Sequence, residues 1–441
     1  METFSDKQTQ KFDVIIVGCS IAGLTLANAL SKCKINYVVL ESQKNLPPPL
    51  TGNAITLLPN GVRILSQLGL LEDLKAASQP ITSHSTWLAS GYLLKTVEMS
   101  QLPSTSSLEE VKVKCADGSS FAGDVVVGAD GIHSATRREA LWHQGLSRAL
   151  SRIQNVPLKL TSEYSGIYGI SNPIPELHPG QAHRTYGNGF SFIVNIGKNG
   201  RIYWLLSIRS KETHQYLPLS RYAQDQASID EQVRPYLDTH ISSTILFKDL
   251  YYNTETCVHV GLEELLCENW VSGNIVCIGD SVHKMTPNLA QGANCAIESA
   301  ASLANRLVCI LDDRQGRVCS DKCGREAILQ SWEASRKHRM RFFYTCSWIL
   351  ARCESFCGTF FKGLGLYIGS YHGEQVISYI SDIDGQTEYL NFLSEPPRVS
   401  KQVLKVNHGC LFLLNYLFVK MAFALLDSSL RLWQFCFPKK G

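Results

Sequence analysis

Residues 12–23 read Phe-Asp-Val-Ile-Ile-Val-Gly-Cys-Ser-Ile-Ala-Gly, and this stretch decides the fold. Its β-branched run predicts a buried strand, its glycines predict a tight turn, and residues 24–30 continue as a helix. Gly18 permits the turn, the small Ser20 lets the backbone approach a pyrophosphate, and Gly23 lets the helix pack closely on the strand. The unpaired N–H groups at the N-terminus of the helix would then face the phosphates. The stretch therefore predicts a dinucleotide-binding βαβ unit.

A second strand, residues 36–40, follows this helix and ends directly before Glu41. A carboxylate at that place accepts hydrogen bonds from both ribose hydroxyls of an adenosine. The alternative interpretation is an ordinary surface acid after a strand. Because the βαβ unit alone does not separate FAD from NAD, the choice between them depends on segments farther along the chain.

Two later segments repeat the pattern of an apolar strand followed by an acidic turn. Residues 124–131 read DVVVGADG, with Asp130 in the turn, and residues 275–280 read IVCIGD. Residues 281–300 then read SVHKMTPNLAQGANCAIESA. The three segments together resemble the glycine-rich, DG and GD motifs of the group A flavin monooxygenases, the aromatic-hydroxylase-like family with tightly bound FAD.

This resemblance implies an α/β fold, in which a Rossmann-like FAD-binding domain carries bound FAD and meets NADPH as a transient co-substrate. It also implies that Asp280 contacts the ribityl or pyrophosphate part of FAD. The helix that begins near Gly292 would point its N-terminus at the flavin O2 edge, where reduced flavin accumulates negative charge. The residues taken as cofactor-binding are Gly18, Ser20, Gly23, Glu41, Ala54, Asp130, Gly279, Asp280, Pro287, Gly292 and Ala293.

A closer resemblance is to the PaxM-like group of fungal membrane-associated monooxygenases, which epoxidise prenyl chains in indole-diterpene and meroterpenoid biosynthesis. The likeness is carried by residues 14–27, 55–71, 279–298 and 331–352. It implies an enzyme of secondary metabolism that uses NADPH and O2 to epoxidise an alkene of a prenylated precursor. Two alternatives stay open, an aromatic-ring hydroxylase of the same family and an inactive, truncated relative.

The chain departs from this family's pattern in two places. Residues 80–107 are a short, Ser- and Thr-rich stretch that lacks the family's FAD-contacting arginine, for which Arg63 comes too early in the chain. Residues 94–110 resemble a join across lost sequence, followed by a strand at 111–115. In addition, Ala290 stands where relatives carry glycine, and a positive φ there would strain the backbone by roughly 1 kcal/mol.

Residues 162–252 are expected to form a β-rich insert over the flavin. The apolar runs 190–196 and 201–208 are separated by Gly-Lys-Asn-Gly, which predicts a hairpin. The aromatic side chains proposed to line an apolar substrate pocket are Tyr186, Phe192, Tyr203 and Trp204, and Tyr203 is the candidate for the catalytic pocket. The alternative for each of them is ordinary core packing.

The order of these segments predicts four regions. Residues 1–160 and 256–330 form the two parts of the FAD-binding domain, and residues 161–255 form the substrate domain. Residues 331–441 form a helical C-terminal region that is expected to associate with a membrane. Its almost wholly apolar segment, about 408–426, is a marginal membrane helix, with burial in a globular core as the alternative.

The overall composition excludes several other classes of protein. A net charge of +3, from 42 Lys+Arg and 39 Asp+Glu, gives no field that would attract nucleic acid. The 15 cysteines lack the spacing of a zinc or redox site, so no metal is expected. Residues 1–11 contain no apolar signal-peptide region. We therefore expect a small polyprenyl substrate, no obligate protein partner, and location on the endoplasmic reticulum membrane with the catalytic domain facing the cytosol.

Overall fold

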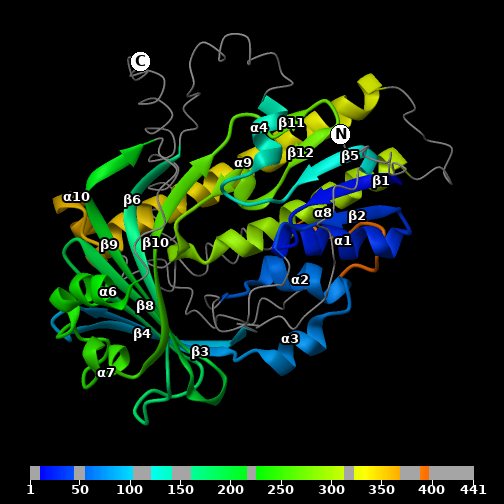
Figure 1. Ribbon diagram of the computed structural model, residues 1–441. Coiled ribbons are helices and arrows are strands. Elements are labelled where there is room, and N and C mark those ends of the chain that lie inside the picture. Colours follow the sequence, from blue (N-terminus) through cyan, green and yellow to red (C-terminus); the bar gives the residue numbers. More distant parts are fainter. Residues whose placement is uncertain are drawn as a thin grey trace, which may run out of the picture.

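The computed structural model describes residues 10–43, 55–102, 121–141, 160–215, 225–311, 322–367 and 388–396. The first of its two sheets has the order β11-β12-β5-β1-β2 (Figure 1). Its strands are β1 (Gln10–Val17), β2 (Tyr37–Leu40), β5 (Phe121–Gly128), β11 (Val271–Ser272) and β12 (Ile275–Cys277). β1 runs parallel to β2 and β5, and β12 runs parallel to β5. The predicted βαβ unit is confirmed, because α1 (Ile21–Cys33) makes the crossover from β1 to β2.

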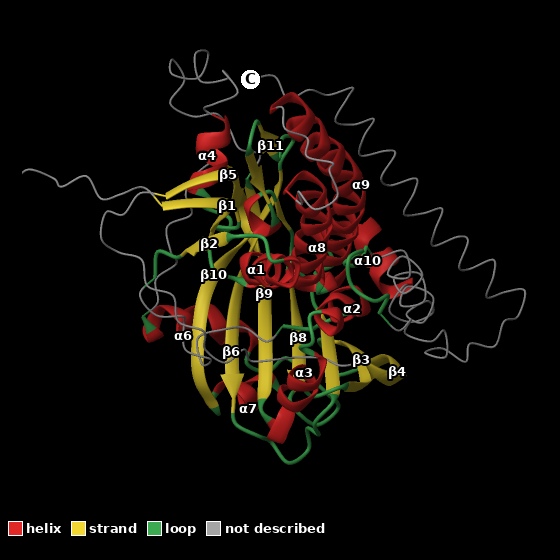
Figure 2. Cartoon of the chain, turned by 90° about the vertical axis from the view of Figure 1, so that its right-hand side faces the viewer, coloured by secondary structure: helices red, strands yellow, loops and turns green. Residues whose placement is uncertain are grey.

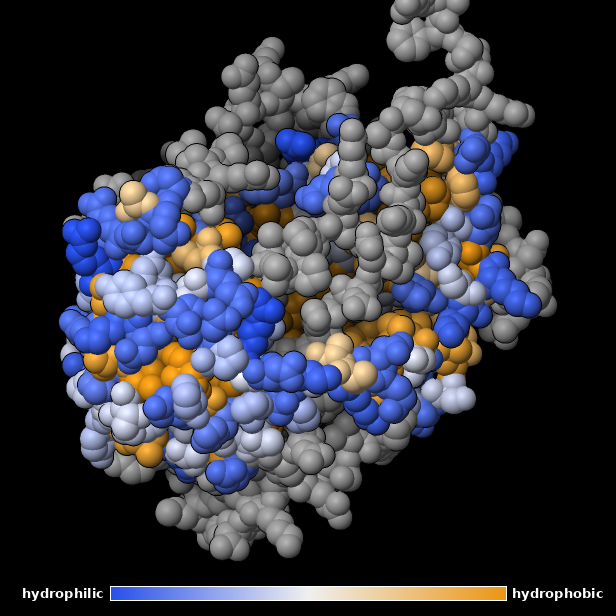
Figure 3. Space-filling model, turned by 60° about the horizontal axis from the view of Figure 1, so that its bottom comes forward, coloured by the Kyte–Doolittle hydropathy of each residue, from blue (hydrophilic) through white to orange (hydrophobic). Residues whose placement is uncertain are grey.

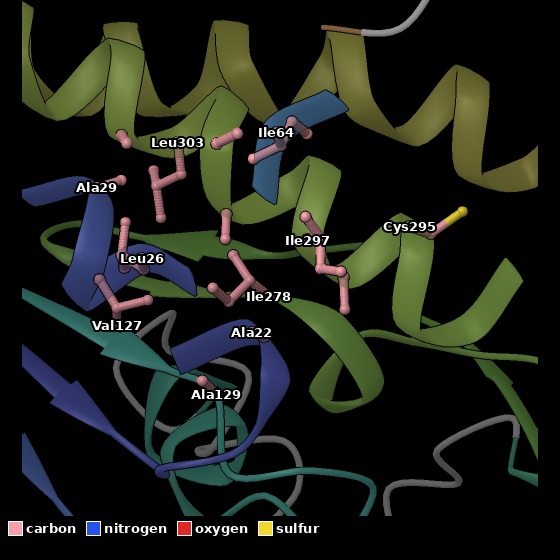
Figure 4. Packing of buried hydrophobic residues seen from close by; sticks show 14 of the residues in the cluster. Ala22, Leu26, Ala29, Ile64, Val127, Ala129, Ile278, Cys295, Ile297 and Leu303 are labelled. Carbon is pink, nitrogen blue, oxygen red and sulfur yellow. The ribbon is translucent and has the colours of Figure 1, made fainter. Parts of the chain in front are cut away.

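Helices pack against this sheet and bury its main hydrophobic core. Leu26 and Ala29 of α1 lie against Leu303 of α8, and Ile64 of α2 closes the cluster from above (Figure 4). Val127 of β5 and Ile278 lie below them in the same view. The helices of this part of the chain are α2 (Pro59–Gln67), α3 (Leu71–Ala77), α4 (Ala135–Leu141) and α8 (Gln291–Leu311).

The second sheet has the order β13-β10-β6-β9-β8-β7-β3-β4, and only the β3–β7 pair is parallel (Figure 2). Its strands are β3 (Ile81–Leu88), β4 (Leu93–Leu102), β6 (Thr161–Ser171), β7 (Gln181–Tyr186), β8 (Phe190–Ile196), β9 (Ile202–Gln215), β10 (Thr254–Leu266) and β13 (His283–Lys284). The hairpin of β8 and β9 is confirmed, and a short turn, η3 (Lys198–Gly200), connects its strands.

Within the stretch 80–107, Ile81–Leu88 and Leu93–Leu102 form the strands β3 and β4, which were not predicted from the sequence. These strands pair with each other and extend the second sheet through β7, although the sequence analysis assigned residues 1–160 to the FAD-binding domain. The domain boundaries themselves stay a prediction. The strand predicted at 111–115 lies outside the described residues.

One face of the second sheet is covered by a separate hydrophobic cluster. Phe192 and Trp204 point to this face, where their rings lie 4.5 and 5.0 Å from the ring of Phe247. The covering helices are α6 (Gln226–Val233) and α7 (Phe247–Tyr251). Side chains alternate between the faces of a strand, so Tyr203 points to the opposite face from Trp204. Phe192 lies in this core and does not line the cavity, so its predicted place in the substrate pocket is wrong. Trp204 packs its ring in the same core and is also among the residues that line the cavity.

The C-terminal described part is helical. α9 (Lys322–Glu354) runs along α8, and α10 (Gly358–Tyr367) turns back on α9 after a break at Phe356, whose φ is 46° (Figure 1). Within the described residues, none of the helices combines the length and the apolar character that a membrane span requires. The predicted membrane segment at about 408–426 lies outside these residues and stays a prediction.

Candidate active site

A cavity of about 1190 Å³ lies between the two sheets. It is larger than the roughly 300–1000 Å³ of a pocket for one drug-sized ligand, so it has room for a large cofactor and a substrate together. Its wall is made by the β1–α1 turn, the end of β2, the turn after β5, the start of α8 and one face of the second sheet. In the space-filling view, apolar surface is visible among polar side chains in the central recess of the molecule (Figure 3).

The turn between β1 and α1 is shaped for close approach of backbone to backbone. Gly18 has a φ of +105°, and a Cβ atom there would overlap the carbonyl group of Ala129. A Cβ atom on Gly23 would overlap the carbonyl oxygen of Gly18. Gly18 and Ser20 line the cavity, whereas Gly23 packs behind the turn and holds α1 against β1. Because the glycines have no side chains, the turn leaves a cradle with room for a pyrophosphate at the N-terminus of α1.

Glu41 stands at the end of β2 and lines the same end of the cavity. Its carboxylate accepts hydrogen bonds from the backbone N–H groups of Cys19 and Gln43, each at 2.9 Å. Burial alone would raise the pKa of Glu41, but these hydrogen bonds and those from Ser42 outweigh burial and hold the pKa below its ordinary value. The carboxylate is therefore ionised and oriented, as an acceptor for ribose hydroxyls must be.

Asp130 lines the cavity but has a structural task as well. Its carboxylate accepts from the hydroxyl of Ser134 at 2.5 Å and from the N–H and hydroxyl of Thr136 at 3.0 Å. These bonds cap α4 and fix the turn after β5. Because that turn also packs against Gly18, Asp130 orders the cradle from the side opposite Glu41.

Asp280 follows β12 in η5 (Gly279–Ser281) and faces the cavity. Lys284 donates to its carboxylate at 2.5 Å. Burial lowers the pKa of Lys284, but Asp280 outweighs burial and raises that pKa above its ordinary value. Gly279, with a φ of +65°, does not line the cavity and packs instead near Ala22 of α1. Sequence reasoning missed Lys284, because a lysine in this motif carries no signal until its partner is placed.

The entry to α8 lies at the centre of the cavity wall. Pro287, Gly292 and Ala293 all line the cavity, and η6 (Pro287–Leu289) leads into the helix. The first N–H groups of an α-helix have no partner within it, so this end attracts negative charge. Asn294 fastens the entry to the segment before α2, because it accepts from the N–H of Leu58 at 2.9 Å and donates to the carbonyl oxygen of Thr56 at 2.9 Å.

Ala290 joins η6 to α8 in the left-handed region, with φ 55° and ψ 23°. The condition under which alanine would be strained at this position is therefore met. Replacing Ala290 by glycine is expected to raise the free energy of unfolding by about 1 kcal/mol, because glycine has no Cβ atom to strain there. The measurement is chemical denaturation of the full chain. The matched control is Ala293→Gly. Ala293 lies within α8, so glycine there is expected to lower the free energy of unfolding by about 1 kcal/mol. If both variants lowered the free energy of unfolding, the proposed backbone strain at Ala290 would be contradicted.

The second sheet contributes the apolar wall of the cavity. Residues that pair across the strands share a face, and Tyr203 pairs with Asn195 and Ile170. All three line the cavity, as does Tyr186. Aliphatic side chains on this wall are Ile193, Leu205, Val258, Val260 and Leu262, and polar ones such as His84, Thr86 and Lys95 line other parts of the same sheet. Tyr203 thus lies where the sequence placed it, and its catalytic role stays a prediction.

The structure brings most of the predicted site residues to one cavity. Those that line it are Gly18, Ser20, Glu41, Asp130, Asp280, Pro287, Gly292, Ala293 and Tyr203. Gly23 and Gly279 lie behind the wall, and Ala54 lies outside the described residues. In the part of the chain that the structure describes, no group of three or more His, Cys, Asp or Glu residues is placed to hold a metal ion. The cavity also contains Arg184, His84 and Glu354, which sequence reasoning missed because they come from three distant segments.

Comparison with known proteins agrees with this geometry. The family profile described as an FAD binding domain matches residues 11–116 and 105–337. The chain is 34% identical to the FAD-dependent monooxygenase spyC of Aspergillus fumigatus, over 94% of this chain and 95% of that protein. It is 33% identical to the FAD-dependent monooxygenase paxM of Penicillium paxilli, over 88% of each.

Two solved structures share the fold. HpxO of Klebsiella pneumoniae, complexed with FAD and uric acid, matches with a TM-score of 0.64 and 20% identity, over 85% of this chain and 96% of that chain. A salicylate hydroxylase substrate complex matches with a TM-score of 0.62 and 17% identity, over 85% and 96% of the two chains. At these identities the likeness concerns the fold alone.

Proposed function

The chain belongs to the FAD-dependent monooxygenases with an FAD binding domain, and on that premise we propose that it epoxidises an alkene of a prenylated precursor. The precursor would be of the indole-diterpene or meroterpenoid type, in secondary metabolism, with NADPH and O2 as co-substrates. FAD is the cofactor, and it supplies the activation of oxygen. The observation that carries the proposal is the shape of the cavity, which has a polar end at the β1–α1 turn and an aliphatic wall on the second sheet.

The residues of the polar end fit FAD. Gly18 and Ser20 would hold the pyrophosphate at the N-terminus of α1, Glu41 would accept from the adenosine ribose, and Asp280 would contact the ribityl chain. The N-terminus of α8, at Gly292 and Ala293, would face the negative edge of the reduced flavin. The shortened stretch 80–107 does not interrupt this end, because it forms strands in the other sheet.

The residues of the aliphatic wall fit a prenyl chain. Ile193, Leu205 and Val258 present hydrocarbon to the cavity, so an apolar alkene gains the hydrophobic free energy of leaving water. The wall also excludes water from the site of oxygen transfer. For this reaction the protein would bind the substrate, orient its alkene and shield the site from water. The reaction does not require a general acid or base from the protein.

An aromatic-ring hydroxylase is the second candidate, and Tyr203 with Asn195 is the observation that favours it. These two side chains are neighbours on the apolar wall and present a hydroxyl and an amide to a phenol. The aliphatic side chains beside them, Ile193, Leu205 and Val258, favour the epoxidase. An inactive relative is supported less, because Gly18, Glu41 and Asp280 are all in place around the cavity.

The location of the protein is a further part of the proposal. We place it on the endoplasmic reticulum membrane, with the catalytic domain facing the cytosol, through the apolar segment at about 408–426. A prenylated substrate that partitions into a bilayer would reach the cavity from there. The partner is then the membrane and a small polyprenyl molecule, with no nucleic acid and no obligate protein.

The test begins with the flavin content of the detergent-purified chain, which is expected to be near one FAD per chain. NADPH oxidation is then followed with a prenylated indole and with the same molecule after hydrogenation of its alkenes. An epoxidase forms an oxygenated product from the first substrate only, because the saturated chain offers no double bond. A hydroxylase of the ring would oxygenate both. A flavin-free but folded chain would support the inactive relative and contradict the proposal.

A further inference from the structure

Arg184 ties together three segments of the cavity wall, one of which leads into α8. It lies on β7, and its guanidinium group donates to the carboxylate of Glu354, to the carbonyl oxygen of Asn288 at 2.7 Å and to Nε2 of His84 at 3.1 Å. All four residues line the cavity. Three of the five N–H donors of the guanidinium group are used in these bonds, so Arg184 holds three parts of the wall together.

Glu354 completes a clamp on Asn288. It is the last residue of α9, its side chain is 1% exposed, and its second carboxylate oxygen accepts from the Asn288 side-chain amide at 2.6 Å. Asn288 is thus held at its backbone by Arg184 and at its side chain by Glu354. Burial raises the pKa of Glu354, and the guanidinium group of Arg184 opposes that rise. Each charge in this pair depends on the other to remain buried.

The clamped residue is part of the entry to α8. Asn288 is the middle residue of η6, which leads through the left-handed Ala290 into the helix end that lines the cavity. His84, the third partner of Arg184, adds no charge, because burial and the neighbouring Arg184 lower its pKa to about 3. The net charge at this point of the wall is therefore set by Arg184 and Glu354.

We propose that Arg184 and Glu354 are positioning residues that fix the Asn288 segment. Because their charges cancel, the pair adds little to the electric field at the flavin, which then comes mainly from the N-terminus of α8. Reduced flavin carries negative charge, so an unbalanced cation in the wall would favour it and an unbalanced anion would disfavour it. The charge balance of the pair would thus keep the reduction potential of the bound FAD from shifting in either direction. This inference rests on the FAD binding of the proposed function, and it does not depend on the substrate.

The experiment measures the flavin reduction potential of FAD-loaded variants by equilibration with a reference dye. Glu354→Gln leaves Arg184 unbalanced and is expected to shift the equilibrium toward reduced flavin about tenfold, which is about 30 mV upward for a two-electron couple. Arg184→Gln removes the counter-charge of Glu354 and, at a pH high enough to keep this buried carboxyl group ionised, is expected to shift the equilibrium away from reduced flavin. Shifts of the same sign, or shifts of less than about threefold in both variants, would overturn the proposal.

A double variant separates charge from position. Arg184→Met with Glu354→Leu removes both charges, and replacement of a buried ion pair by apolar side chains is well tolerated, so this variant folds even where a single variant does not. Its potential is expected to stay within about threefold of the wild-type equilibrium, while its affinity for FAD falls because the clamp on Asn288 is gone. A shift as large as that of Glu354→Gln would overturn the proposal.

The matched control is Glu255→Gln. Glu255 also forms an ion pair with an arginine of the second sheet, Arg201, but both side chains are about one third exposed and neither lines the cavity. This variant is expected to leave the potential unchanged. A chain that holds FAD, shows the opposite shifts and fails to epoxidise a prenyl alkene would refute the proposed function and leave this inference standing.

Discussion

Replacing Gly23 by alanine is expected to reduce the FAD content of the purified protein at least about tenfold. The added Cβ atom would overlap the carbonyl oxygen of Gly18, and both atoms belong to backbone that cannot rotate away. The turn must then open, and overpacking of this kind costs about 1–3 kcal/mol, of which 1.4 kcal/mol is already a factor of ten in affinity. The measurement is the ratio of flavin absorbance to protein absorbance after gel filtration in the presence of FAD.

The control for this variant is Gly363→Ala in α10, where an added Cβ atom meets nothing within 4 Å. It is expected to retain the wild-type flavin content, and a small gain in helix stability would be consistent with it. Circular dichroism of both proteins separates loss of FAD from loss of the fold. Wild-type flavin content in Gly23→Ala would refute the role of this glycine in the cradle.

Replacing Glu298 by glutamine is expected to lower the free energy of unfolding by about 3–5 kcal/mol. Glu298 is fully buried in α8, and it pairs with Arg336 at 2.9 Å and with Arg339 at 2.6 Å, both on α9. The variant leaves the buried guanidinium group of Arg336 without a counter-charge, so the packing of α9 on α8 is weakened. Urea denaturation, followed by tryptophan fluorescence, measures the change.

The pH dependence gives this prediction a second readout. Burial raises the pKa of Glu298, but the two arginines outweigh burial and hold its pKa below the ordinary value. Such a group stabilises the fold above its unfolded pKa, about 4.3, and that stability is lost as the pH falls through the lower folded pKa. The difference in free energy of unfolding between the wild type and Glu298→Gln is therefore expected to be largest at pH 7 and to become smaller below about pH 4.

The control is Glu72→Gln, which removes one partner of the exposed pair with Lys75. Surface pairs contribute about 0–1 kcal/mol, so this variant is expected to change stability by less than about 1 kcal/mol. An equal loss in both variants would show that the charge triad between α8 and α9 is not a major source of stability.

The sequence predicted the FAD-binding half of this molecule well, because its signals are local. The β1–α1 turn depends on a few consecutive residues, and the structure confirms the βαβ unit that they predict. The strands β3 and β4 were not predicted, because residues 80–107 showed only a Ser- and Thr-rich composition and residues 94–110 resembled a join across lost sequence. Their place beside β7 depends on a pairing between residues far apart in the chain.

The candidate site divides in the same way. Glu41 and Asp280 follow strands and were found from that position, whereas Arg184, Asn288 and Glu354 meet only in three dimensions. Phe192 shows a different kind of error, because it lies in the core and does not line the cavity. Aromatic side chains in a hairpin mark a buried sheet, but the sequence does not say which of the two buried faces belongs to the core. The pairing of β8 and β9 with their neighbouring strands determines which face of the sheet is the core face.

The alternation of side chains along β9 separates the residues that shape the substrate range from those that hold the protein together. Tyr203 and Leu205 face the cavity, whereas Trp204 and Leu206 belong to the core beneath α6 and α7. A mutational library restricted to the cavity-facing positions of this sheet would therefore vary the shape offered to a substrate without removing core packing. Descendants of one such enzyme can in this way acquire new substrates through single substitutions while the fold tolerates each step.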